Sequence, residues 1–532
     1  MLARSLCVLF VACSSGSTPS PPATRHDAGK IKPEKSSKPD DALGALDFQV
    51  SEGNPDARAH FSRGLLALHS FWYDEASREF GAAIAADPKM NMAYWGAAMS
   101  LCKLLWGEDD VAGARAFLAR MPDPDHVSPR EQAWILALVE LLTDEDVRTS
   151  RKKFAAAMEQ LNQAYPDDES ATFLAISLLS TIRPEDPSPT TVRNRAAALA
   201  AGVFKHNPKH PGAAHYLIHA YDTPELASLA LPYAIAYAKI APAAFHALHM
   251  PAHIFVRLGM WREAIASCQA AWDASVAAAK REHLSADHGD FHSLSWLVEM
   301  NFELGQRAAS DAALATFANA VRGGLSHSSR VLFANEVTSY AMRTGEWQRM
   351  DELLSPLDAP ATEDPAPARA GSGMAHCAPA DPSSPVIVLE HQAIIHAHLW
   401  AAAMLHQPAG VEKLLGELDK VDATLHAFLV STQSEKGVAK IVRANARLRT
   451  AMRARAKGDD RALLAVLRQS VEEDVESAGE SNPTGFIVNE EIADALMRTK
   501  QPALAAAAYA LVLAKHPGRA RAMLGAQRAA TK

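Results

Sequence analysis

Helical hairpins that recur with a period of 34 residues constrain the fold of this chain more than any other feature. Residues 57–95 carry small and aromatic residues at fixed spacings: Gly64, Tyr73, Ala76, Phe80, Ala83 and the pair Asp87-Pro88. The same spacings return near the other end of the chain, at Ala505, Tyr509, Val512 and Pro517. Pro208 and Pro242 are one period apart (242 − 208 = 34). Because 532 residues are too many for one ordinary core, a repeat array is expected.

Each copy of this pattern predicts two antiparallel helices. Small side chains at Gly64 and Ala76 let the helices approach closely, Phe80 fills the seam, and Pro88 ends the second helix. No stretch shows the alternation of β-branched residues that is typical of strands. The pattern resembles the tetratricopeptide repeat. This resemblance implies an all-α fold, a tetratricopeptide-like solenoid of helical hairpins wound into a right-handed superhelix.

The N-terminus predicts export and a lipid anchor. In residues 1–13, one Arg precedes a short apolar run, the layout of a secretory signal. Phe10-Val11-Ala12-Cys13 resembles the lipobox of bacterial lipoproteins, although the lipobox more often begins with Leu. The resemblance implies lipidation of Cys13; an ordinary signal cleaved nearby is the alternative. We therefore expect a lipid-anchored protein of the bacterial cell envelope, periplasmic or at the outer membrane, that touches the membrane through the anchor only.

Composition divides the remainder of the chain. Residues 14–44 are rich in Ser, Pro, Lys and Asp and predict a disordered tether. Residues 45–354 form the N-terminal array, and 386–525 form a second helical, tetratricopeptide-like part. Between them, 355–385 read as a Pro/Ala-rich loop, too long for an ordinary helix connection. Whether this loop separates two arrays or interrupts one continuous superhelix stays open.

Charge and motifs limit the classes of function. The net charge is −8 and the folded part contains no block of Lys and Arg, so we expect no nucleic-acid partner. The chain holds no P-loop, no GxSxG elbow and no zinc-ribbon cysteines. These observations favour a binding protein over an enzyme.

Histidines gather in residues 206–292, where H-x-x-x-H pairs recur. With Gly259 counted as position 15 of its repeat, His249 and His253 occupy positions 5 and 9. With Pro242 counted as position 32, His215 and His219 occupy the same two positions. Positions 2, 5 and 9 form one helical stripe, and in tetratricopeptide proteins this stripe of the first helix lines the ligand groove. The predicted site comprises His215, His219, His246, His249, His253 and His292, with Asp222 continuing the stripe.

A longer resemblance covers roughly residues 55–345. The segments HPGAAHYLIHAYD and HALHMPAHIFVRLGMW are similar to those of a widespread bacterial group of tetratricopeptide-repeat proteins. Since that group has no settled biochemical activity, the resemblance implies an architecture and a place for the site, and no reaction.

Three interpretations of the histidines remain open. In the first, which is our first hypothesis, they line a groove that binds a peptide, protein or small ligand, and the chain is an interaction scaffold. As an alternative, the two pairs supply four nitrogens to a divalent transition metal such as zinc, with Asp222 or Asp287 nearby, in a metal-binding protein or a metal-dependent hydrolase. The general base of an H-E-x-x-H motif is absent, because Tyr216 and Met250 follow the first histidine of each pair. The third interpretation is structural: the rings hydrogen-bond between helices.

Overall fold

The computed structural model describes residues 42–106, 109–123, 127–143, 146–183, 189–362, 385–432, 435–473 and 488–531. Within these ranges the chain forms 23 α-helices joined by short turns, and the all-α fold is confirmed. The predicted signal segment, the lipobox and most of the tether lie outside the described residues.

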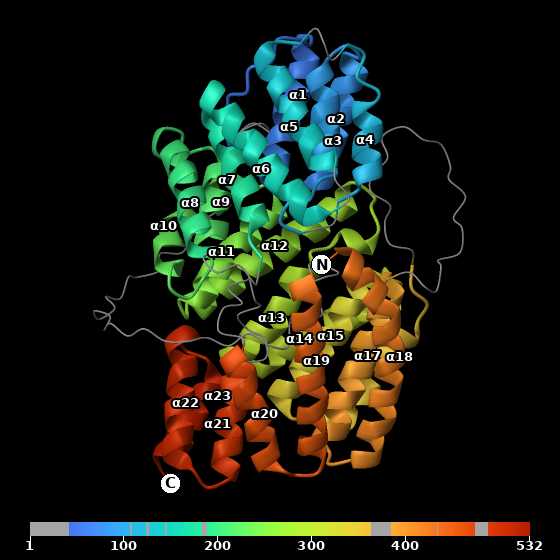
Figure 1. Ribbon diagram of the computed structural model, residues 1–532, viewed down its shortest axis with the longest axis vertical. Coiled ribbons are helices and arrows are strands. Elements are labelled where there is room, and N and C mark those ends of the chain that lie inside the picture. Colours follow the sequence, from blue (N-terminus) through green and yellow to red (C-terminus); the bar gives the residue numbers. More distant parts are fainter. Residues whose placement is uncertain are drawn as a thin grey trace.

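Helices of the N-terminal half follow the predicted hairpins. Their bounds are α1 Pro55–His69, α2 Tyr73–Ala86, α3 Asn91–Ser100, α4 Val111–Leu118, α5 Pro129–Thr143, α6 Val147–Ala164, α7 Asp168–Thr181, α8 Pro189–His206, α9 Pro211–Tyr221, α10 Ala227–Ile240, α11 Phe245–Arg257 and α12 Trp261–Arg281. Consecutive helices pack against each other along this series. Figure 1 shows α1 to α10, coloured blue to green, stacked in one half of the molecule.

Helices of the C-terminal half continue the array. Their bounds are α13 Phe291–Glu303, α14 Arg307–Arg322, α15 His327–Thr344, α16 Met350–Leu354, α17 Pro385–Met404, α18 Pro408–Thr432, α19 Glu435–Ala456, α20 Asp460–Glu473, α21 Val488–Arg498, α22 Pro502–Lys515 and α23 Ala520–Ala530. Short 3-10 helices lie at Ala286–His288, Trp347–Arg349 and Ser355–Asp358. No helix in the described ranges combines the length and the apolar character that a membrane crossing requires.

The hairpin seam forms as the repeat pattern predicts. A side chain at Gly64 or Gly96 would collide with the ring of Phe80, and one at Gly525 would collide with the ring of Tyr509. Both aromatic side chains are 0 % exposed. Glycine on the neighbouring helix therefore makes room for the aromatic residue that fills each seam.

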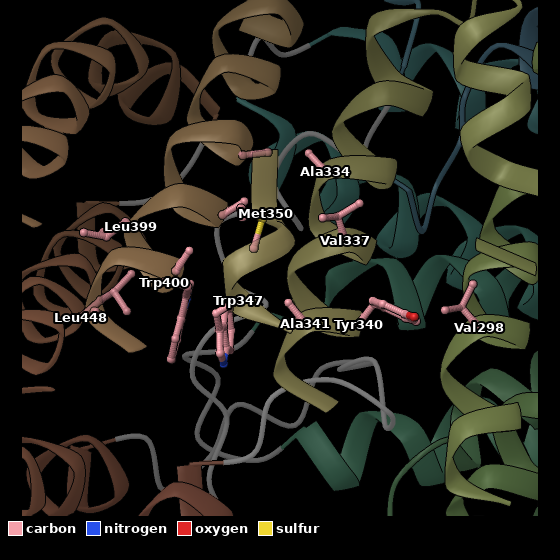
Figure 2. Packing of buried hydrophobic residues seen from close by; sticks show 14 of the residues in the cluster. Val298, Ala334, Val337, Tyr340, Ala341, Trp347, Met350, Leu399, Trp400 and Leu448 are labelled. Carbon is pink, nitrogen blue, oxygen red and sulfur yellow. The ribbon is translucent and has the colours of Figure 1, made fainter. Parts of the chain in front are cut away.

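Hydrophobic packing does not divide at the predicted loop. One buried cluster runs from Leu43 to Ile254, and a second runs from Ala252 to Ala529, so the two cores meet at α11. The second cluster crosses the predicted boundary because α15 packs directly against α17. Figure 2 shows this continuity: Ala341 of α15 lies near Trp347, whose ring stacks on Trp400 of α17 at 6.3 Å between centroids. Residues 363–384 lie outside the described residues.

The two ends of the described chain both return to the array. Residues 42–45 run beside the starts of α9 and α11, where the amide of Ala45 donates to the carbonyl of Lys209 (2.9 Å). Leu43, inside the predicted tether, is 1 % exposed. At the other end, the indole N–H of Trp261 donates to the carbonyl of Pro517 (3.2 Å), so the α22–α23 turn contacts the turn after α11. Helix α11 therefore lies at a junction of the whole fold.

Candidate functional site

The six predicted histidines meet in two groups of three where α9, α11 and α13 adjoin. His215, His219 and His246 form the first histidine set, and His249, His253 and His292 form the second histidine set. Within each set, one ring nitrogen from every residue lies within 4.8 Å of the other two. A metal ion bound tetrahedrally at about 2.0–2.1 Å from imidazole nitrogens needs ligand atoms roughly 3.3 Å apart, and three of the Nε2 pairs in these groups lie 2.9–3.2 Å apart.

The repeat register explains the grouping. Each set takes positions 5 and 9 from one first helix and position 2 from the next first helix along the array. Helix α11 belongs to both sets, with His246 in the first and His249 and His253 in the second. At the same positions of α13 stand Ser295 and Glu299, so the pattern of histidines ends there. The sets are thus two copies of one arrangement, not one site with four nitrogens.

In the first histidine set, the ring nitrogens face one another. Nε2 of His215 lies 2.9 Å from Nε2 of His219 and 3.2 Å from Nε2 of His246. Nδ1 of His215 lies 2.7 Å from the backbone carbonyl of His69. Because a carbonyl only accepts, this nitrogen carries the proton, and Nε2 of His215 presents a lone pair to the other two rings.

In the second histidine set, the same reasoning assigns the proton of His253, whereas Nδ1 of His249 has two partners that can donate or accept. Nδ1 of His253 donates to the carboxylate of Asp222 (2.9 Å). Nδ1 of His249 lies 2.9 Å from Oγ of Ser293, which also bonds Asp290, and 3.5 Å from Sγ of Cys268, whose thiol can donate to it. Nε2 of His253 presents a lone pair to Nε2 of His249, 3.0 Å away. Either the proton of His249 or a cation can lie between these two nitrogens.

Burial holds the rings in the neutral form that binds metals. His215 is 0 % exposed and His249 is 1 % exposed. The pKa of each lies well below its usual value, first because burial disfavours the charged ring and then because neighbouring imidazoles repel its charge. His246, His253 and His292 are partly exposed and form the accessible side of the two sets.

Aromatic side chains enclose both sets. Phe71, in the turn between α1 and α2, has a left-handed backbone (φ 53°), rare for a bulky residue, and its ring contacts that of His215 at 4.4 Å between centroids. It also stacks on His246 at 5.4 Å. Trp296 of α13 contacts the rings of His249 and His253 at 5.1 and 4.8 Å. The repeat pattern did not indicate Phe71, which comes from a turn about 150 residues before the histidines; Trp296, four residues after His292, shares its helical face.

The two predicted acidic residues have other partners. Asp222 accepts from the ring of His253 and, at 2.9 Å, from the guanidinium of Arg257. It lies behind the ring and orients it, as carboxylates do for metal-binding histidines. Asp287 accepts from the amide and hydroxyl of Ser326 and belongs to neither set.

A third buried cluster beside the first set was not predicted. The carboxylate of Glu169, on α7, lies 2.8 Å from Nε2 of His69 and 2.9 Å from Nε2 of His210; we call these three residues the Glu169 network. The amide of Ala213 donates to Nδ1 of His210, which leaves the proton on Nε2 to face the carboxylate. Burial alone would raise the pKa of Glu169, but the two imidazoles outweigh it and hold the pKa below its usual value.

Comparisons with known proteins identify neither a family nor a function. No protein-family model matches the chain, and no curated protein matches it. Among solved structures, the Cut9–Hcn1 hetero-tetramer of the APC/C is 14% identical, with 89% of this chain and 76% of that chain covered and a TM-score of 0.37. Yeast Tom70 is 9% identical over 90% of this chain and 89% of that chain, with a TM-score of 0.31. Human IFIT1 with PPP-AAAA is 11% identical over 90% and 95%, with a TM-score of 0.36. At these TM-scores the similarities carry no argument about function.

Proposed function

We propose that this protein binds transition-metal ions, one ion to each histidine set. The observation that supports this proposal most directly is the close approach of imidazole nitrogens with no carboxylate between them: Nε2 of His249 and His253 lie 3.0 Å apart, and Nε2 of His215 lies 2.9 Å from Nε2 of His219. The lone pairs on Nε2 of His215 and His253 can coordinate a cation in place of accepting a hydrogen bond. His292 supplies the third ligand, and the first histidine set repeats the arrangement.

The ligand type favours zinc, copper, nickel or iron. Imidazole suits these ions, whereas magnesium, calcium and manganese prefer oxygen ligands, and neither histidine set includes a carboxylate among the described residues. The partner of His253, Asp222, and the partner of His215, the carbonyl of His69, fix the rings in the orientation that presents Nε2.

Metal content tests this proposal. The purified chain, incubated with zinc or copper and then freed of loosely held metal, is expected to retain two ions, one for each set. His292→Ala is expected to retain one. His391→Ala is a matched control, since His391 is exposed on α17 and belongs to neither set, and it should retain as much metal as the unaltered chain. A chain that retains no ion after such loading would remove the proposal.

The interaction scaffold expected from the sequence is a second candidate, for other surfaces of the solenoid. The burial of His215, His219 and His249 favours an ion over a peptide as their ligand. A peptide or protein partner would then bind elsewhere on the array. Partners captured equally by the unaltered chain and by His249→Ala would agree with this division, and loss of a partner in His249→Ala would return the histidines to the binding surface.

We also propose that a lipid on Cys13 anchors the protein to a membrane of the bacterial cell envelope. The order of a charged residue, an apolar run and Cys13 supports the anchor. Cys13→Ser is expected to shift the protein from the membrane fraction to the soluble fraction. A variant that stays with the membrane would contradict this proposal.

A further inference from the structure

The two histidine sets are close enough to act together. Helix α11 supplies His246 to the first set and His249, almost one turn later, to the second. The centroids of these two rings are 6.2 Å apart. Since each ion would lie about 2 Å from its imidazole nitrogens, ions in the two sets would be near neighbours.

Charge limits which ions can occupy two such sites at once. The six imidazoles are neutral as ligands, and neither set includes a carboxylate within the described part of the chain. Two carboxylates lie behind the second set, and each already has another partner: Asp222 accepts from Arg257 and Asp290 from Ser293. Two divalent ions would bring four positive charges into a largely buried place where these carboxylates offset only part of the charge, which is costly. Univalent ions halve that charge, and a bridging anion offsets it.

Copper provides both a univalent ion and, once oxidised, a pair of ions that holds a bridging anion. Copper(I) is univalent, accepts three imidazoles and needs no further ligand. Two copper(I) ions can each give one electron to dioxygen, which becomes a bridging peroxide dianion between two copper(II) ions. No proton is consumed, no bond to the protein changes, and the net charge of the pair stays at two positive charges. The oxidised pair is thus no harder to bury than the reduced pair.

The surroundings suit a small ligand that contains oxygen. Phe71, Trp106 and Trp296 contact the rings of the two sets and leave the partly exposed rings as the accessible side. The indole N–H of Trp296 is buried with no hydrogen-bond acceptor among the described residues, while its ring lies 4.8 Å from that of His253. An oxygen ligand on the second ion would offer this N–H an acceptor.

We propose that the two histidine sets form one dinuclear copper centre that binds dioxygen between its ions. This inference rests on the proposed function, since it requires that both sets bind metal, and it adds the identity of the ion, the coupling of the two sites and the class of ligand.

The experiment loads the purified full-length chain with copper(I) in the absence of oxygen, removes loosely held copper and then admits dioxygen. The expected result is two coppers per chain, one dioxygen consumed for every two coppers, and little electron paramagnetic resonance signal, because a bridging ligand couples the two copper(II) spins. His292→Ala and His246→Ala each disrupt one set. Each should bind one copper, which after oxidation gives the signal of an isolated copper(II) ion. His391→Ala should behave as the unaltered chain.

The outcomes separate this inference from the proposed function. Two bound coppers that give the full signal of two isolated copper(II) ions would overturn the dinuclear centre and leave metal binding intact. Retention of zinc with no retention of copper(I) would do the same. If the unaltered chain retains no ion of either metal, both proposals are overturned together.

Discussion

The Glu169 network and the two histidine sets are neighbouring clusters of buried histidines that differ in what faces the ring nitrogens. In the Glu169 network a carboxylate lies between two imidazoles, so each N–H that points inward meets an acceptor. In the histidine sets, imidazole nitrogens face other imidazole nitrogens at 2.9–3.2 Å. A carboxylate fixes the first arrangement, whereas the nitrogens of the second can either share protons or coordinate a cation. A buried histidine therefore indicates a site only when its partners are examined as well.

Metal should stabilise the histidine sets and leave the Glu169 network unaffected. A ligand at 100 times its dissociation constant adds about 2.7 kcal/mol to the free energy of unfolding for each site, so two filled sets add roughly 5 kcal/mol. Denaturant unfolding with and without zinc or copper(I) measures this difference. In Glu169→Gln the increment should persist, whereas in His292→Ala half of it should disappear. An increment that does not depend on His292 would place the metal elsewhere.

In the metal-free protein, removing the carboxylate of Glu169 should lower the free energy of unfolding more than removing the ring of His292. Glu169→Gln leaves the buried ring N–H groups of His69 and His210 competing for one amide oxygen, and it also removes a buried charge from its partners. Breaking a buried ionic network in this way costs about 3–5 kcal/mol of the free energy of unfolding. His292→Ala, at a partly exposed position, should cost less than about 1 kcal/mol in the metal-free protein. Denaturant unfolding of both metal-free variants checks the contrast, and equal losses would contradict it.

The histidine stripe could be predicted from the sequence, but its division into two sets could not. Positions 2, 5 and 9 follow from the repeat period, which places His215, His219, His249 and His253 on equivalent faces of two helices. Whether four nitrogens converge or each pair recruits a third ring depends on the offset between successive hairpins, and a sequence pattern does not contain that offset. For the same reason Glu169 was missed: its partner His69 is 100 residues away, at the turn of a different hairpin.

A change at Asp222, which lies behind the second histidine set, should weaken metal binding less than the loss of a metal-binding histidine. Asp222→Asn keeps an oxygen that can accept from Arg257 or from the ring of His253, but it removes the negative charge that orients this ring and raises its basicity. Such partners of metal-binding histidines are typically worth 10–100-fold in affinity. Competition with a chelator should therefore show about that loss for one ion and no change for the other. Equal weakening of both ions would indicate general damage to the fold, which unfolding of the metal-free variant would reveal.

Acidity should separate the buried imidazoles from the carboxylate of Glu169 by the pH at which each loses its contribution to stability. Burial, reinforced by neighbouring rings, holds the pKa of His215 and His249 below the ordinary value of 6.5, so the unfolded chain takes up their protons first. Their contribution is complete above pH 6.5 and declines as the pH falls below it, by up to about 1.4 kcal/mol per pH unit for each group. In the Glu169 network, burial also lowers the pKa of His69 from 6.5, which adds to the same decline, whereas the pKa of Glu169 is lowered from an ordinary value of 4.5, so its contribution declines only below that pH. The free energy of unfolding of the metal-free protein, measured between pH 7.5 and 4, should therefore fall in two stages. In His249→Gln the slope of the upper stage should decrease, and in Glu169→Gln the lower stage should lose its contribution. An upper stage that His249→Gln leaves unchanged would mean that burial does not hold this ring neutral, and the contrast between a carboxylate-centred cluster and one of neutral imidazoles would lose its basis.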